Sequence, residues 1–127
     1  MNAKLGKKII SFGNKWLCHE FSSGCYPGED YLKFQTEYRS VLRAVAEEAG
    51  YKLVKFNKNH YCFSAVLQEI ETQAYAYVSI SDVRGSSTDW FYRILYRQME
   101  NANDWKGKEN HYCDLSDLDK CLKRLYK

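Results

Sequence analysis

The chain has a single proline, an odd number of cysteines and no long apolar run among its 127 residues. Because no stretch is long and apolar enough to span a bilayer, we do not expect a membrane-spanning protein. The basic start of the chain is not followed by an unbroken apolar stretch, so we expect no secretory leader. Five cysteines without close pairs are typical of reduced thiols, and we predict five free cysteines in a cytoplasmic protein.

The sequence also lacks the local motifs that identify many enzymes. It contains no glycine-rich phosphate loop, no serine nucleophile elbow and no dinucleotide-binding glycine pattern. Charge of one sign does not dominate either, since the net charge is only +3. A mildly basic chain permits an acidic partner without demanding one. We therefore favour binding over catalysis and expect no cofactor.

Aromatic residues, by contrast, are plentiful. They make up 16% of the chain, and eleven of them are tyrosines, which suit half-buried sheet faces and binding surfaces. The length and an apolar content of 45% fit one domain, residues 1–127, with a sizeable core. The one proline, Pro27, lies in a stretch rich in serine and glycine, which predicts a loop. This loop separates an N-terminal helix and loop, residues 1–28, from a main body, residues 29–127.

Apolar residues recur at helical spacing in three segments. The first predicts a helix over residues 3–20, and the second predicts a helix that begins near Glu29 and ends near Gly50. The third lies at the C-terminus and carries Leu115, Leu118, Leu122 and Leu125. The segment 116–119 resembles a capping box at the start of this last helix.

Between the second and third helices the pattern is that of β-strands. Aromatic and β-branched runs cover residues 51–57, 61–70, 74–84 and 90–99. The breaks between these runs are too short to hold crossover helices, so the strands should pair as antiparallel hairpins. The predicted order is ααββββα, an α+β fold in which two N-terminal helices and one C-terminal helix cover one face of a four-stranded antiparallel sheet.

The tetrapeptide Asn-His-Tyr-Cys occurs twice, at residues 59–62 and 110–113. If the two copies met in space, His60, Cys62, His111 and Cys113 would supply the ligand types that zinc prefers. Recognised zinc modules, however, bring their ligands in tighter pairs than His-x-Cys. The alternative is that both copies are structural residues at turns and strand edges. We therefore expect no bound metal.

The third and fourth strand runs carry the strongest candidates for a binding surface. The guanidinium groups of arginines on neighbouring strands can donate paired hydrogen bonds to phosphates, and the rings of flanking tyrosines can stack on bases. The competing interpretation is a structural ion pair between Asp82 and an arginine at a sheet edge. The candidate binding residues are Tyr77, Ser79, Ser81, Asp82, Arg84, Arg93, Tyr96 and Arg97.

An enzymatic alternative rests on His60, at the start of the second strand run. A histidine there could act as a general acid or base, with the arginines stabilising a phosphoryl charge. The substrate would then be RNA or a phosphorylated metabolite. A single histidine at a strand start is also a common structural residue, so His60 is only a minor catalytic candidate.

The run from about residue 34 to residue 110 resembles a group of small proteins carried by phages, plasmids and conjugative elements of Gram-positive bacteria. The matching stretches are residues 59–64, 77–84, 94–97 and the 104–107 loop that leads to Asn110. Cys62 and Cys113 are not typical of the group, and the group often has a second glycine where this chain has Lys108, which counts further against zinc. The resemblance carries no catalytic residue with it.

What the resemblance implies is a biological context. Accessory proteins of mobile elements include inhibitors of host defence, anti-CRISPR proteins among them, which bind a nuclease complex or its nucleic acid. We therefore expect an anti-CRISPR-like accessory protein with a protein or ribonucleoprotein target, and nucleic acid as a further candidate partner. A small enzyme and a purely structural interaction domain are the alternatives.

Overall fold

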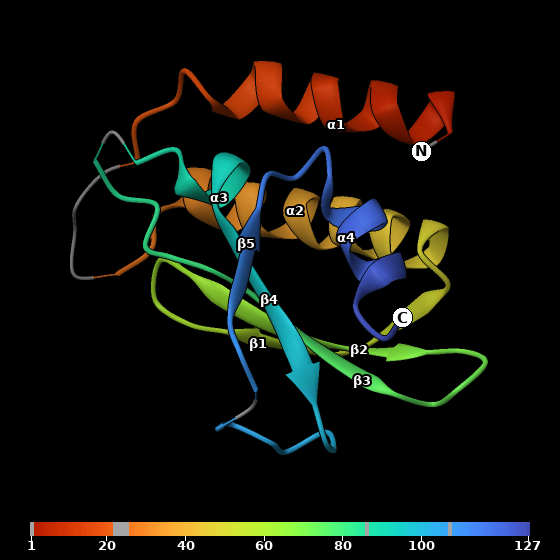
Figure 1. Ribbon diagram of the computed structural model, residues 1–127. Coiled ribbons are helices and arrows are strands. Elements are labelled where there is room, and N and C mark those ends of the chain that lie inside the picture. Colours follow the sequence, from red (N-terminus) through yellow and green to blue (C-terminus); the bar gives the residue numbers. More distant parts are fainter. Residues whose placement is uncertain (1, 22–25, 86, 107) are drawn as a thin grey trace.

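The fold is seen in a computed structural model that describes residues 2–21, 26–85, 87–106 and 108–127. The helices are α1 (Ala3–Trp16), α2 (Glu29–Glu48), α3 (Asp89–Tyr92) and α4 (Leu118–Arg124). The strands are β1 (Tyr51–Lys58), β2 (Phe63–Glu69), β3 (Tyr75–Ile80), β4 (Ile94–Met99) and β5 (His111–Cys113). The helices lie on one side of the sheet, with α1 outermost and α2 between α1 and the strands (Figure 1).

The sheet is an antiparallel meander in the order β1-β2-β3-β4-β5. The predicted α+β class and the antiparallel pairing are therefore confirmed, but the sheet has five strands rather than four. The additional strand is β5, which pairs with β4 and places Tyr112 opposite Leu95. Three residues are too few for a period of two to be recognised in a sequence.

The fourth strand run is wrong at its beginning. Residues 89–92 form the short helix α3, in which the Phe91 and Tyr92 amides donate to the Thr88 carbonyl, and β4 begins only at Ile94. The predicted capping box at residues 116–119 is wrong too, because the N-cap of α4 is Asp117 and its side chain makes no capping hydrogen bond. Gly50 ends α2 as expected, with a φ of 85° that only glycine adopts without strain.

Aromatic side chains dominate the core between the helices and the sheet. Phe34, on α2, is fully buried, and its ring lies within 6 Å, centroid to centroid, of six other rings. These rings come from α1, α2, α3 and the segment after α1: Phe12, Trp16, Phe21, Tyr31, Tyr38 and Trp90. The cluster explains how α3 is fixed, because Trp90 is the buried residue of that single turn.

A buried hydroxyl ties α2 to α3. Tyr38 is fully buried, and its hydroxyl donates to the Trp90 carbonyl at 2.6 Å. Burial raises the pKa of Tyr38 well above its ordinary value, so the hydroxyl keeps the proton it donates.

We expect Tyr38→Phe to lower the free energy of unfolding by about 1–2 kcal/mol, because the Trp90 carbonyl would lose its buried donor while the ring stays in place. Urea unfolding measures this change. Tyr92→Phe is the matched control, since Tyr92 is exposed, and it should change stability by less than about 0.5 kcal/mol. Equal effects of the two substitutions would contradict the assignment.

Four of the five cysteines belong to the described residues, and Cys18, Cys62, Cys113 and Cys121 are all free. Cys25 lies outside the described residues. Cys18 is exposed, whereas burial raises the pKa of the Cys113 thiol far above its ordinary value.

Because the thiolate is the form that reacts, alkylation with iodoacetamide at pH 8 should modify Cys18 faster than Cys113 in the native protein. Mass spectrometry of peptides at successive times gives the two rates. A Cys113 that reacts as fast as Cys18 would mean that β5 does not stay paired with β4.

Among the described residues, no helix is long and apolar enough to cross a membrane.

Candidate binding surface on the uncovered face of the sheet

The face of the sheet that points away from the helices carries polar and aromatic side chains. Cross-strand partners share a face, so the register of Val66 with Tyr77 and of Tyr77 with Arg97 places these three side chains on the outer side. The outward positions of the five strands are Lys52, Lys55, Asn57, Ser64, Val66, Gln68, Tyr75, Tyr77, Ser79, Leu95, Arg97, Met99 and Tyr112. No aspartate or glutamate occupies any of these strand positions.

The described part of the β4–β5 connection, residues 100–106 and 108–110, lies against part of this outer face. Lys55 on β1 donates to the Asn103 side chain at 2.9 Å, and the Trp105 ring makes an edge-to-face contact with Tyr77. The connection buries Arg97, which is only 4% exposed. The Arg97 guanidinium donates to the carbonyls of Gln98 (3.2 Å) and Asp104 (2.9 Å) and lies 4.6 Å above the Tyr77 ring.

A first hollow of about 240 Å³ opens beside this stack. Trp105 and Lys106 form its wall on the side of the β4–β5 connection, and Ser79 and Leu95 come from β3 and β4. The Trp105 ring is 57% exposed. The first hollow is lined by Tyr77, Ser79, Leu95, Arg97, Trp105, Lys106 and Asn110.

A second hollow of about 290 Å³ adjoins the first and shares Ser79 and Leu95 with it. In this hollow the exposed ring is that of Tyr112, which is 46% exposed. The Arg93 guanidinium lies over this ring, 3.9 Å from its centroid. The lining is completed by Ile80, Ser81 and Asp89. We call the two hollows together, with their rims, the outer groove.

The outer groove thus brings together five of the eight predicted binding residues: Tyr77, Ser79, Ser81, Arg93 and Arg97. Tyr96 lies elsewhere, because it pairs with His111 on the helix side of the sheet, with the two rings 5.3 Å apart. Sequence reasoning missed Trp105, Lys106, Asn110 and Tyr112. A lone tryptophan in a polar loop was the available signal.

Asp82 and Arg84 form a local pair rather than a cross-strand one. The Arg84 guanidinium meets the Asp82 carboxylate at 2.6 Å, and this hydrogen bond, against the opposing effect of partial burial, lowers the pKa of Asp82 below its ordinary value. The same guanidinium lies 4.7 Å from the Tyr61 ring. The ion pair weighed from the sequence was one across the hairpin, whereas the observed pair joins Asp82 to Arg84 two residues along, beyond the end of β3, and does not involve Arg93 or Arg97.

His60 lies in the turn between β1 and β2, where its ring stacks on Tyr61 at 5.5 Å. Of the arginines invoked for catalysis, Arg84 lies on this side of the molecule, because its guanidinium is 4.7 Å from the same Tyr61 ring. Arg97 is held under the β4–β5 connection instead. The arginines invoked for catalysis are thus divided between two places on the molecule.

The two Asn-His-Tyr-Cys copies do not assemble one metal site. Cys62 immediately precedes β2 and Cys113 lies on β5, which are separated by three steps across the sheet. At about 4.8 Å for each step, that separation is about 14 Å, far beyond the reach of ligands around a single ion. In the described part of the chain, no group of three or more His, Cys, Asp or Glu side chains is placed to hold a metal.

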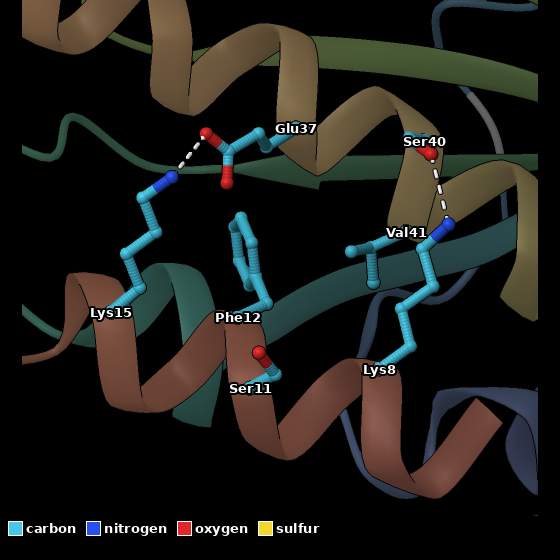
Figure 2. A pocket seen from close by; sticks show the side chains of 7 residues that line it. All are labelled: Lys8, Ser11, Phe12, Lys15, Glu37, Ser40 and Val41. Carbon is cyan, nitrogen blue, oxygen red and sulfur yellow. Dashed lines mark hydrogen bonds and ion pairs between the residues drawn. The ribbon is translucent and has the colours of Figure 1, made fainter. Parts of the chain in front are cut away.

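A further hollow, of about 300 Å³, lies between α1 and α2 (Figure 2). Lys15 Nζ meets the Glu37 carboxylate at 2.8 Å, and Lys8 Nζ donates to the Ser40 hydroxyl at 2.9 Å. Both lysines thus bridge the two helices, and Phe12 and Val41 form an apolar floor between them. These contacts indicate that the hollow is a gap in the packing of α1 against α2.

No protein-family model, no curated protein and no solved structure matches the chain. The functional argument therefore rests on the geometry of the outer groove and on the sequence.

Proposed function

We propose that the protein is a binding protein that acts through the outer groove. The observation that carries this proposal is the pair of exposed rings, Trp105 and Tyr112, beside two adjoining hollows on the face of the sheet that has no helix over it. Exposed aromatic rings in a polar, hollowed surface are typical of sites where a partner binds. Such rings become anchors when a partner removes them from water.

We further propose that the partner is a nuclease ribonucleoprotein of a bacterial host, and that the protein is an accessory inhibitor of a mobile element. The support is the resemblance in residues 59–64, 77–84 and 94–97. Inhibition by binding needs no catalytic group, and it agrees with the division of His60 and the arginines between two places.

The test is affinity capture from a lysate of a Gram-positive host, followed by mass spectrometry of protein and nucleic acid. Trp105→Ala should weaken capture by about 30-fold or more, since a central aromatic anchor contributes about 2 kcal/mol or more. Tyr26→Ala is the matched control, because Tyr26 is 85% exposed and lies outside the outer groove, and it should leave capture unchanged.

Capture alone does not support the proposal; the difference between the two variants does. Equal capture by Trp105→Ala and the parent protein would overturn it. Turnover of RNA or a phosphorylated substrate that His60→Ala abolishes, with capture retained, would favour the enzymatic alternative.

A further inference from the structure

We infer that the outer groove binds single-stranded RNA, with Trp105 and Tyr112 each stacking on one base and Lys106 and Arg93 holding the adjacent phosphates. This inference rests on the proposed function, because it names what the same groove recognises. It applies to RNA carried by the target complex.

The first argument is charge. The outward strand positions include Lys52, Lys55 and Arg97 and no carboxylate, and the groove adds Arg93 and Lys106. Among the described residues that line the two hollows, Asp89 is the one acidic side chain. A surface of this composition attracts a polyanion.

The second argument is the repetition of one arrangement. Each hollow has an exposed ring, a cation next to the ring and access to the Ser79 hydroxyl that both share. In the first hollow the ring and cation are Trp105 and Lys106, and in the second they are Tyr112 and Arg93. Two consecutive nucleotides present the same alternation of base and phosphate.

Two features of the groove indicate which class of nucleic acid it would bind. The rings can stack only on bases that are not already stacked in a duplex, so the ligand is single-stranded. Ser79, Ser81 and Asn110 place hydroxyl and amide groups at the hollows, and such groups can hydrogen bond to the 2′-hydroxyl that distinguishes RNA from DNA. An acidic peptide would engage the cations but would leave the two rings without a stacking partner.

The test is fluorescence anisotropy with a labelled dodecamer of uridine, titrated with the full-length protein at several salt concentrations. We expect saturable binding below about 100 µM at 50 mM salt. With the two cations Lys106 and Arg93 engaged, the logarithm of the binding constant should fall with the logarithm of salt at a slope of about −1.4.

The variants separate stacking from charge. Trp105→Ala and Tyr112→Ala should each weaken binding about tenfold, because base–aromatic stacking contributes about 1–3 kcal/mol per base, and Tyr26→Ala should not. Lys106→Gln should make the salt slope shallower by about 0.7, whereas Lys123→Gln, the same charge change on α4, should leave the slope unchanged. Thermal melting of each variant shows that its fold is kept.

Three results would overturn the inference: no saturable binding, equal binding by Trp105→Ala and Tyr26→Ala, or binding of a thymidine dodecamer as tight as that of the RNA. The outcomes also separate this inference from the proposed function. If Trp105→Ala loses capture of the host complex while the parent protein binds no RNA, the groove recognises protein and only the RNA assignment fails. If RNA binds through Trp105 but capture is unaffected, the proposed function fails instead.

Discussion

Phe34→Ala is expected to lower the free energy of unfolding by about 3–5 kcal/mol. The ring is fully buried on α2 and is surrounded by rings from α1, from α3 and from the segment after α1. Its removal leaves a cavity that rigid aromatic neighbours cannot fill, so the loss includes both transfer free energy and packing. For a domain whose total stability is about 5–15 kcal/mol, this is a large part of the whole.

The matched control is Leu32→Ala, two residues away on the same helix but exposed. It should change stability by less than about 0.5 kcal/mol, because alanine is a good helix former and little packing is lost. Urea unfolding of both variants gives the comparison. A loss below 1 kcal/mol for Phe34→Ala would contradict an aromatic core that joins α1, α2 and α3.

The second large effect is expected at Arg97. Arg97→Met should lower the free energy of unfolding by about 2–4 kcal/mol, although the methionine keeps much of the buried volume. The guanidinium donates to two backbone carbonyls, covers the Tyr77 ring and so fixes the β4–β5 connection against the sheet. Without it, the carbonyl of Asp104 loses its charged donor.

Arg93→Met is the control for this prediction. Arg93 is exposed and contacts the Tyr112 ring, so its loss should amount to no more than about 1 kcal/mol. Thermal or urea unfolding measures the difference. Equal stability of the two variants would mean that the guanidinium of Arg97 does not hold the connection in place.

These expectations distinguish a buried, structural Arg97 from an exposed Arg93, a distinction that the sequence could not predict. The sequence predicts one strand over residues 90–99, and alternation along such a strand would place Arg93 and Arg97 on the same face. The helical turn of α3 ends at Tyr92, so Arg93 follows a helix and Arg97 lies within β4. Burial of Arg97 depends on two carbonyls, one of them seven residues away in a loop, and local pattern carries no information about such a contact.

The sequence predicts best those elements in which a periodic apolar pattern repeats over many residues. α2 presents apolar residues at steps of three and four over 20 residues, and its bounds were close to those observed. The antiparallel pairing of the strand runs was also predicted correctly, because short polar breaks leave no alternative to hairpins, although the third and fourth runs were predicted too long. β5 was missed, since three residues become a strand only through their pairing with β4.

The candidate site was predicted in part, for the same reason. Alternation placed Tyr77 and Ser79 on one strand face, but the register that brings Arg97 opposite Tyr77 is known only from the structure. Trp105 and Tyr112 could not be predicted, because each reaches the groove through a loop or a short strand whose position depends on the rest of the fold. The exposed rings, which carry the functional argument, were thus the residues least visible in the sequence.

The central claim is that the outer groove is the surface the partner covers. Hydroxyl-radical footprinting of the captured complex, with mass spectrometry of the oxidised side chains, tests this claim most directly. Trp105 and Tyr112 should oxidise several-fold more slowly in the complex than in the free protein, while Tyr26 should oxidise at the same rate in both. Protection of Tyr26 with unchanged oxidation of Trp105 and Tyr112 would contradict the account.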